Sequence, residues 1–542
     1  MDFQKLFLFL IFSFSGILLW NGWERSQHPD TLVKQSVPQI DTATKNTISV
    51  LNTEKKQHNQ EDLVEPNSAA GQIITVTTDT LRIEINTVGG DIQHVELLKH
   101  KDTLDSNKPF VLLQKNKLTY TTQSGLLGNG LPTHHSIYTT ESLNYSLSND
   151  KDKLEVKLKS EQAGVTKVLT FHRNSYLITT TFQIENRTNG EITPSAYFQI
   201  LRDETPPEGA SKLLPTYTGP AIFTEKNKFQ KIEFSNIEKN KAEYPHESKD
   251  GWIAMLQHYF VAAWLPQGNG EREFYAKQIS KGLFTIGTII PIGKINPGEI
   301  KQISAELYVG PASSKLNNIA AGLGLTVDYG WLTIIATPLF WLLSSIELFV
   351  HNWGVAIILL TILIKLLFFP LSAASYKSMA KMRVVAPKLE KIKQQYSDDR
   401  EKLNRAMMEL YKEEKINPLG GCLPMLIQIP VFIALYWAIL SSVELRHAPF
   451  FGWISDLSAA DPYYILPALM GLSMIIQSRL SPAPADPLQA KMMKLMPIVF
   501  SVVFFFFPAG LVLYSVVNNI LSISQQWFIT KNLEKANKLA TT

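Results

Sequence analysis

Hydrophobic and polar positions divide the 542-residue chain into a polar first half and an apolar second half. Residues 24–325 are largely polar, whereas residues 330–530 consist mainly of long apolar runs. Because a helix of about 20 apolar residues crosses the roughly 30 Å hydrocarbon core of a bilayer, the second half predicts several membrane spans. The chain is also too long for one hydrophobic core, so several domains are expected.

The first apolar run, residues 1–23, predicts an uncleaved signal anchor that crosses the membrane. A cleaved signal peptide is the alternative, but no small-residue cleavage site follows the run and its start carries little positive charge. Residues 24–71 contain no aromatic residue and are rich in Thr, Ser, Gln, Asn and Lys. Such a composition cannot bury enough surface to offset the entropy of ordering, so this segment is predicted to be a flexible linker.

Alternation of apolar and polar positions predicts β-strands between residues 72 and 311. Many short strands with one polar face are typical of an antiparallel sandwich. The domain is predicted to cover residues 72–325, with a short helix near residues 313–322 closing it. The clearest signals are the strands Leu81–Asn86, Leu154–Lys159 and Tyr176–Ile184 and the turn at Asn189-Gly190.

Residues 326–351 form an apolar segment whose length would allow a span. Pro338, Ser344, Ser345 and Glu347 interrupt it, and nearby tryptophans favour an interface. A span here would also place the β domain and the basic segment after residue 376 on one side, against the positive-inside rule. The segment is therefore predicted to be an interfacial helix on the periplasmic surface.

The later apolar segments predict five more spans, which makes the fold class a polytopic α-helical membrane protein with six spans and a large periplasmic antiparallel β-sandwich domain. Lysines and arginines place the N-terminus, the hairpin and the tail on the cytoplasmic side. The predicted spans are 352–375, 418–443, 463–480, 491–507 and 508–529, joined by a cytoplasmic helical hairpin at 376–417, a periplasmic loop at 444–462 and a cytoplasmic loop at 481–490, and followed by a cytoplasmic tail at 530–542.

The hairpin has an apolar seam on a polar, basic background. Met382, Val385, Leu389, Ile392 and Tyr396 are separated by steps of three and four, as are Leu403, Met407 and Leu410 on the return. Ser397, Asp398 and Asp399 predict a turn with a helix N-cap, and Pro387 predicts either a kink or the start of the first helix. Two interpretations stay open: a solvated hairpin, or one that contacts anionic headgroups, nascent chains or ribosomes. For the second, the candidate contact residues are Met382, Arg383, Lys388, Tyr396 and Met407.

Lys365 lies inside the predicted span 352–375, where a charge costs roughly 2.5–3.5 kcal/mol. Snorkelling of the long side chain toward water is one explanation. The other is a wet groove inside the bundle, because polar residues recur on the other spans and none of the spans carries an acidic residue well inside it. Ordinary hydrogen bonding between helices is the alternative for those residues. The candidate groove residues are Lys365, Thr361, Gln428, Tyr514, Ser515 and Asn518.

Composition and motifs exclude several function classes. The net charge of +4 is too small and dispersed to indicate nucleic acid binding, and the single cysteine, Cys422, excludes a disulfide framework. His134 and His135 could be a metal pair, but neighbours on a strand face opposite ways, so surface histidines are predicted. No nucleotide-binding loop, catalytic triad or metal spacing is present, so no enzyme, cofactor or metal is expected.

A device that receives a polar segment of another chain fits best; the alternatives are a polytopic transporter with a solute site at Lys365 and a membrane-anchored periplasmic scaffold.

Six motifs make the chain resemble the YidC/Oxa/Alb family of membrane protein insertases, in its Gram-negative form. The resemblance covers nearly the whole chain. The motifs are VDYGWL (Val327–Leu332), SMAKMR (Ser378–Arg383), NPLGGCLP (Asn417–Pro424), SVELR (Ser442–Arg446) with Ala448-Pro449, DLSAADPYYILP (Asp456–Pro467) and FPAGLVLY (Phe507–Tyr514).

This resemblance implies a five-helix insertase core in the bacterial inner membrane, with a hydrophilic groove open to cytoplasm and lipid, and a periplasmic β-super-sandwich. It implies that the chain inserts and chaperones nascent membrane proteins, alone or with the Sec translocon and its accessory subunits, and receives them from the ribosome or the signal recognition particle. The family's groove cation is usually arginine, and Lys365 stands at the matching position. A tyrosine pair often follows the last motif, whereas here Tyr514 is followed by Ser515.

Overall fold

The computed structural model describes residues 71–541, except for 104, 161–163, 208–215, 328, 330–331, 397–398, 415–422 and 481–486. The predicted anchor at 1–23 and the predicted linker, apart from its last residue, Gly71, lie outside the described residues.

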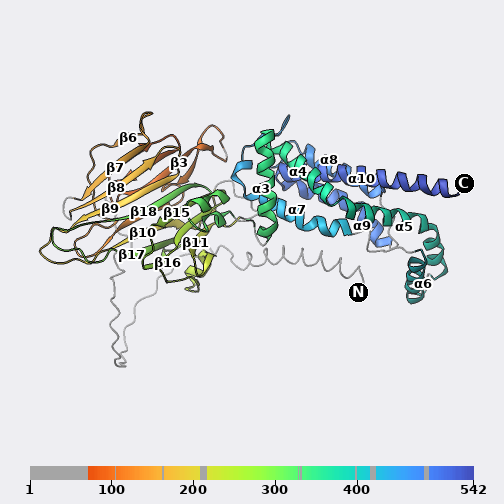
Figure 1. Cartoon of the computed structure of the whole chain (residues 1–542), viewed down its shortest axis with the longest axis horizontal. Helices are drawn as coiled ribbons and strands as arrows, with labels where there is room; N and C mark the ends of the chain where they lie inside the picture. Colours follow the sequence, from red (N-terminus) through yellow and green to blue (C-terminus); the bar gives the residue numbers. More distant parts are fainter. Residues whose placement is uncertain are drawn as a thin grey trace, which may run out of the picture. The chain divides into compact units, whose positions relative to one another are not determined.

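The described residues from Ile73 to Pro311 form a β-sandwich of two sheets (Figure 1). One sheet has the order β13-β16-β17-β10-β5-β3-β2-β1-β6, with β4 paired to β3, and the other has the order β12-β11-β14-β15-β18-β9-β8-β7. The strands are β1 (Ile73–Thr77), β2 (Leu81–Asn86), β3 (Asp91–Lys101), β4 (Pro109–Leu113), β5 (Tyr120–Leu127), β6 (Asn144–Ser146), β7 (Lys153–Ser160), β8 (Val165–His172), β9 (Leu177–Glu185), β10 (Ser195–Asp203), β11 (Gly219–Thr224), β12 (Lys228–Lys231), β13 (Glu247–Ser248), β14 (Trp252–Gln257), β15 (Phe260–Pro266), β16 (Arg272–Ser280), β17 (Leu283–Pro291) and β18 (Ile300–Pro311).

The period-two pattern directs one face of each predicted strand into the core. In β9, Ile178, Thr180, Phe182 and Ile184 are buried while the residues between them are half-buried. The same alternation buries Leu81, Ile83 and Ile85 of β2. The strand pairings are antiparallel except that β1 pairs with β6 in parallel. The prediction of a two-sheet sandwich is confirmed.

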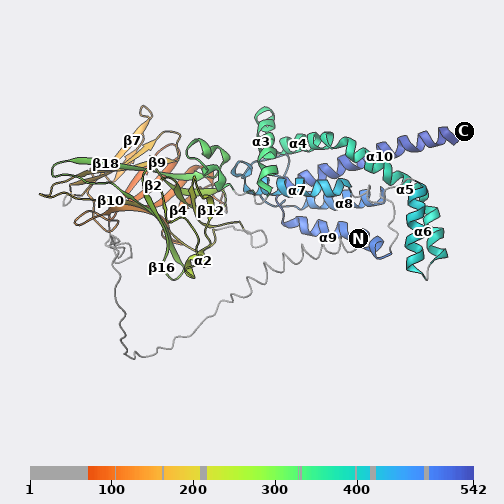
Figure 2. The same ribbon diagram turned by 60° about the horizontal axis from the view of Figure 1, so that its bottom comes forward.

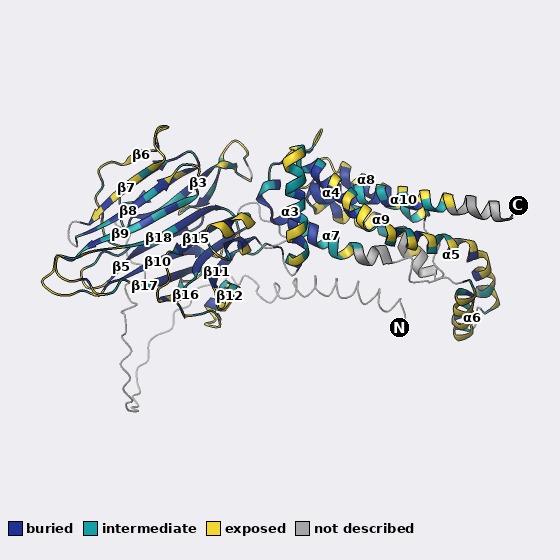
Figure 3. Ribbon diagram, viewed as in Figure 1, coloured by how far each residue is buried: buried dark blue, intermediate teal, exposed yellow. Residues whose placement is uncertain are grey.

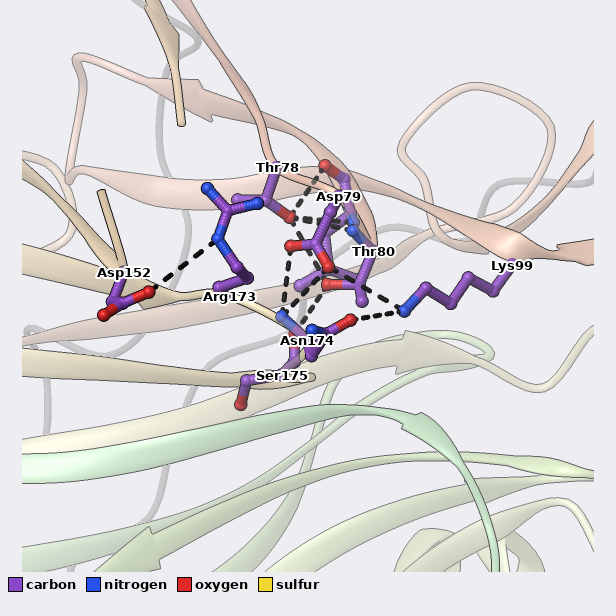
Figure 4. A network of polar contacts seen from close by, with 9 residues as sticks. Thr78, Asp79, Thr80, Lys99, Asp152, Arg173, Asn174 and Ser175 are labelled. Atoms are coloured by element: carbon purple, nitrogen blue, oxygen red, sulfur yellow. Dashed lines mark hydrogen bonds and ion pairs between the residues drawn. The ribbon is translucent and has the colours of Figure 1, made fainter. Parts of the chain in front are cut away.

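Two turns from different sheets are tied together at one end of the sandwich (Figure 4). The Thr80 hydroxyl, in the β1–β2 turn, donates to the carbonyl of Ser175 over 2.7 Å. The Asn174 amide, in the β8–β9 turn, donates to both carboxylate oxygens of Asp79 at 3.0 and 3.1 Å, and Lys99 Nζ donates to Asn174 Oδ1 at 2.8 Å. Asn174 has φ = 52°, a left-handed conformation that asparagine tolerates well. These bonds hold the two sheets in register at this end.

His134 corrects one prediction about the sandwich surface. Its side chain is buried, and its Nδ1 lies 2.5 Å from the hydroxyl of Tyr197 on β10. The expectation of a surface histidine was wrong here, because residues 133–136 form a turn that folds against the sheet instead of a strand. The domain end also differs from the expected helix, since residues 314–326 form two short 3₁₀ segments, Ser314–Asn318 and Leu323–Thr326.

The second half of the described chain is helical. Helix α10 packs against α4, α5, α7 and α8, and α3 packs against α4 and α7. At the start of α4, a Cβ on Gly354 would lie 2.0 Å from the Phe450 ring, so glycine allows this close approach. The helices are α2 (Phe234–Glu238, within the sandwich), α3 (Thr333–Val350), α4 (Trp353–Leu367), α5 (Phe369–Gln395), α6 (Arg400–Glu413), α7 (Leu423–Ser441), α8 (Ile465–Leu480), α9 (Pro487–Val503) with a 3₁₀ turn at Phe504–Phe506, and α10 (Ala509–Thr541).

The predicted span 352–375 is two helices in the structure. Helices α4 and α5 meet at Phe368 with a bend of 67°. Pro370 explains the break, because proline has no N–H to donate and its ring displaces the carbonyl four residues earlier, whereas it fits in the first turn of a new helix. Helix α5 then continues through Pro387 to Gln395, so no helix begins at Pro387. The boundary of the cytoplasmic hairpin at residue 376 remains a prediction.

Length and composition mark one described helix, α3, as able to cross a membrane, and a second if the bent pair of α4 and Phe369–Met382 is one span. Three other apolar helices are shorter: Gln428–Ser441, Ile465–Leu480 and Leu495–Phe506. Figure 3 shows exposed positions along α3, where Ile334, Trp341, Leu348 and Phe349 leave more than two thirds of their surface uncovered. The structure therefore leaves the predicted count of six spans, and the interfacial position of residues 326–351, as predictions.

The loop after α7 contacts the sandwich through Arg446. Its guanidinium lies 5.2 Å from the ring of Phe110 and 5.7 Å from that of Phe260, and it donates to Thr103 Oγ1 at 2.8 Å. His258 Nε2 is also 2.8 Å from the carbonyl oxygen of Leu440, at the end of α7. Residues at and just after the end of α7 thus contact the β domain directly.

Candidate functional site

Lys365 lies in the last turn of α4 and is half-buried. Its ammonium donates to the hydroxyl of Ser522 on α10 at 2.7 Å, and that hydroxyl donates to the carbonyl of Asn518 at 2.8 Å. The break at Phe368 places this cation at a helix C-terminus, where the free carbonyls and the helix dipole favour positive charge. Within the described residues no carboxylate pairs with Lys365, and its acceptor is the neutral hydroxyl of Ser522.

A pocket opens beside the Lys365 side chain. It is small and partly open to the surface, with about 360 Å³ of space between its walls when the adjoining solvent is included. Its walls come from α4, α5 and α7, and they combine one cation, one amide and one hydroxyl with apolar side chains. The lining residues are Ile364, Lys365, Phe368, Leu371, Ser372, Gln428 and Val431.

Gln428 connects this pocket to the middle of α10. Its side-chain amide donates to the hydroxyl of Tyr514, which is buried. The Tyr514 ring lies 6.3 Å from that of Phe432, one turn after Gln428 on α7. Tyr514 therefore stands behind the pocket wall and orients Gln428.

Three other candidate residues, Thr361, Ser515 and Asn518, do not line this pocket. The hydroxyl of Thr361 donates to the carbonyl of Ile357 at 2.6 Å, and that of Ser515 donates to the carbonyl of Leu511 at 2.9 Å. Both side chains are buried and are satisfied by their own helices. Asn518 contributes its backbone carbonyl to Ser522. Groove roles for the side chains of these three residues remain predictions.

Three residues outside the six candidates also lie at the site: Ser522, Ser372 and Tyr376. The Tyr376 side chain is buried and hydrogen-bonds to Ser522. The position of Ser522 follows from spacing, because Tyr514, Asn518 and Ser522 follow each other in steps of four and share one face of a helix. Tyr376 has no such signal, since it approaches Ser522 only because α5 packs against α10.

Helices α5 and α6 lie side by side (Figure 2) and bury their apolar seam between them. Val385, Leu389 and Leu410 are buried, and Met382, Ile392, Met407 and Tyr411 pack around them. Asp399 caps α6 by accepting from the amides of Glu401 and Lys402, as predicted. Two of the five predicted contact residues, Met382 and Met407, thus help to hold the hairpin closed.

The other predicted contact residues differ in position. Lys388 is exposed and pairs with Glu414 at 2.6 Å, and Tyr396 ends α5 with its side chain half-buried. The side chain of Arg383 and residues 397–398 lie outside the described part of the chain. Contacts of this hairpin with other molecules remain predictions.

Matches to known proteins cover both halves of the chain. Residues 73–342 match the family described as the YidC periplasmic domain, and residues 345–537 match that described as the 60Kd inner membrane protein. The chain is 52% identical to the membrane protein insertase YidC of Methylobacillus flagellatus, over 99% of this chain and 98% of that protein. It is 51% identical to the protein of the same name from Nitrosospira multiformis, over 98% of both. A crystal structure of an active YidC insertase with its first transmembrane domain resolved covers 84% of this chain and 94% of that one, at 18% identity and a TM-score of 0.39. The chain belongs to the YidC family of membrane protein insertases.

Proposed function

We propose that this protein inserts nascent membrane proteins into the bacterial inner membrane and helps them to fold, and that Lys365 is the centre of the groove that receives them. The observation that carries the proposal is the Lys365 ammonium, which has a neutral hydroxyl as its protein partner and borders a pocket with Gln428. A lysine held in this way has N–H donors left for another molecule.

The proposed mechanism needs no covalent chemistry. A polar or acidic segment of a nascent chain loses much less hydration free energy beside an ammonium and an amide than in hydrocarbon. Once that segment is accommodated, the adjoining apolar helix moves sideways into lipid, where the hydrophobic effect favours it. Apolar walls formed by Ile364, Phe368 and Val431 allow that helix to leave without breaking further polar contacts.

The proposed topology has six spans, a cytoplasmic N-terminus and hairpin, and a periplasmic β-sandwich. Two observations support it. The contacts of Arg446 and His258 place the loop after α7 beside the sandwich, as expected if both are periplasmic. Helix α10 has 33 residues, and its lysines follow the apolar part, which favours a cytoplasmic end.

The proposed partners are nascent membrane proteins, membrane lipids, the Sec translocon with its accessory subunits, and the ribosome or signal recognition particle. The basic surface of the hairpin and its position next to the groove support the ribosome and the signal recognition particle as partners, since α5 is continuous from Phe369, beside the pocket, to Gln395. No direct role for nucleic acid, metal or cofactor is part of the proposal.

An insertion assay in proteoliposomes tests this function. The purified chain should promote insertion of a small membrane protein without added nucleotide. Lys365→Ala and deletion of Tyr376–Lys415 should each reduce insertion, whereas Lys315→Ala, a lysine outside the helical region, serves as a matched control. Full activity of both groove variants would rule out the proposed mechanism. Loss of activity on removal of residues 72–311 from a bundle that stays folded would favour a scaffold role instead.

A further inference from the structure

A second pocket lies between α5 and α10, away from the groove. It is a shallow hollow open to the surface, with about 640 Å³ of space when the adjoining solvent is included. Ala373, Ala374 and Ile529 form its apolar part, and Lys377 and Asn532 form its polar part. The two alanines leave room next to the helix backbone, which explains why closely packed helices retain a hollow here.

The polar and apolar parts are arranged in the same order on both helices. On α5, Lys377 follows Ala373 by four residues, and on α10, Asn532 follows Ile529 by three, so each polar residue shares a helix face with its apolar neighbour. Both helices run toward the cytoplasm in the proposed topology. The pocket thus changes from apolar to polar in the direction in which a lipid of the inner leaflet changes from acyl chain to headgroup.

The depth of the pocket matches the inner edge of the bilayer, provided that α10 crosses it as proposed above. At about 1.5 Å per residue, Ile529 lies roughly 30 Å and Asn532 roughly 35 Å from the start of α10 at Ala509. That is about the thickness of the hydrocarbon core. Trp527 indicates the same depth, at the inner edge of the bilayer. It is half-exposed, and Lys531 Nζ lies 4.5 Å from its ring centroid, an arrangement typical of the membrane interface.

The charge around the pocket is positive. Lys377 and Lys381 lie one turn apart on α5, and Lys531 lies next to Asn532 on α10. In the described part of the chain, no carboxylate comes within ion-pairing distance of these three lysines. An anionic headgroup fits such a site better than a zwitterionic one, because the ammonium of a zwitterion would be repelled.

We infer that this pocket binds the phosphate of an anionic phospholipid, with Lys377 and Asn532 as donors to the phosphate oxygens. The glycerol and the first acyl carbons pack on Ala373, Ala374 and Ile529. Nothing in the insertion mechanism requires this site, so it is a separate property of the same helices. One bound lipid links α5 to α10, the two helices that supply Tyr376 and Ser522 next to Lys365.

The test is a lipid titration of the purified full-length protein in detergent, followed by native mass spectrometry. Dioleoyl phosphatidylglycerol should bind at least about fivefold more tightly than dioleoyl phosphatidylcholine, as expected for one lysine–headgroup contact. Lys377→Gln should remove most of this preference, and Ala374→Trp, which fills the pocket without changing charge, should weaken binding of both lipids. Lys412→Gln is the matched control, because Lys412 is an exposed lysine of α6 and its loss removes the same charge.

Three results would overturn the inference: equal affinity for the two lipids, equal effects of Lys377→Gln and Lys412→Gln, or displacement of the lipid by glycerophosphoglycerol at equal concentration. The last would assign the site to a soluble phosphate ester. Insertion by the same preparations is measured in parallel. If the protein shows no preference for the anionic lipid while its insertion activity still depends on Lys365, this inference alone is overturned. If the lipid preference is present but insertion no longer depends on Lys365, the proposed function alone is overturned.

Discussion

Two lysines, the buried Lys167 in the sandwich and the half-buried Lys365 in the helical bundle, have opposite surroundings. Lys167 is 1% exposed, and its ammonium donates to the carbonyls of Gly89 and Gly90 at 2.9 Å and of Ser124 at 3.4 Å. Its three N–H groups therefore have three acceptors. Lys365 is half-buried, with the hydroxyl of Ser522 as its described acceptor and a pocket at its side.

This difference separates a structural cation from a candidate functional one. Lys167 joins β8 to the turn before β3 and to β5, and it lies 5.5 Å from the ring of Phe182, so all its interactions are internal. Among the described residues Lys365 has one acceptor, the hydroxyl of Ser522, so two of its three N–H donors have no described partner. A buried charge by itself is thus a weak indicator of function, whereas a buried charge with unused donors and adjoining space is a stronger one.

The largest expected effect is at Lys167. Lys167→Met leaves three carbonyls and the Asp91 carboxylate without their cation, which should destabilise the β domain by about 3–5 kcal/mol. Thermal unfolding of the full-length protein measures the change. Lys157→Met is the control, because Lys157 is exposed on the neighbouring strand β7 and its replacement should cost under about 1 kcal/mol. Equal melting temperatures for the two variants would refute the structural role of Lys167.

The pH dependence of stability at Asp91 provides the second test of the sandwich. Burial raises the pKa of Asp91 to about 7, although Lys167 acts in the opposite direction, and one carboxylate oxygen has no hydrogen-bond partner. The folded state therefore holds this proton more tightly than the unfolded state, and the contribution of Asp91 to stability falls as pH rises from about 4 to about 7. Asp91→Asn removes this dependence, so the variant should gain on the order of 2–4 kcal/mol over the wild type across that range.

The difference in unfolding free energy between Asp91→Asn and the wild type at each pH separates the contribution of Asp91 from that of the histidines. Burial lowers the pKa of His134 to about 3 and those of His100 and His258 to about 4, so their contribution to stability rises with pH up to about 6.5 in both proteins. Chemical denaturation at pH 4.5 and pH 7.5 is sufficient. A pH-independent difference would mean that Asp91 is ionised throughout.

At Lys365, charge should matter more than shape. Lys365→Glu should lower insertion of an acidic client by at least tenfold, about 1.4 kcal/mol, whereas Lys365→Arg should retain most activity because it keeps the charge. Initial rates in proteoliposomes measure both. The melting temperature of the β domain should stay unchanged in each variant, in contrast to Lys167→Met. An active Lys365→Glu variant would show that the cation has no role in the groove.

The smallest effect is expected at Ser522. Ser522→Ala removes the described acceptor of Lys365 and a partner of Tyr376, but it leaves the charge in place. Insertion should change by less than about threefold, and stability by about 1 kcal/mol, the usual contribution of one hydrogen bond. Ser524→Ala is a suitable control, since that exposed hydroxyl bonds only to its own helix at Ile520. A loss as large as that of Lys365→Glu would make Ser522 part of the binding groove.

Local patterns in the sequence were sufficient to predict secondary-structure elements in both the sandwich and the helical region. Period two predicted β2, β7 and β9, and steps of three and four predicted the seam of Val385, Leu389 and Leu410. The costly position of Lys365 was also visible in the sequence, because hydropathy depends only on neighbouring residues. These features follow from the backbone geometry of single helices and strands, which repeats over a few residues.

Only the tertiary structure decided which of the two lysines has unused donors. The partner of Lys365 lies 157 residues later, and Lys167 meets carbonyls 77 and 78 residues earlier. The bend at Phe368 likewise converts a mid-span lysine into one at a helix end, although Pro370 alone does not specify the angle. Contacts of this kind depend on how whole elements pack, and packing minimises the free energy of many distant residues together. Sequence periodicity carries no information about that choice, so the chain itself determined its strands, its helices and the presence of a buried cation, and the fold determined what that cation can bind.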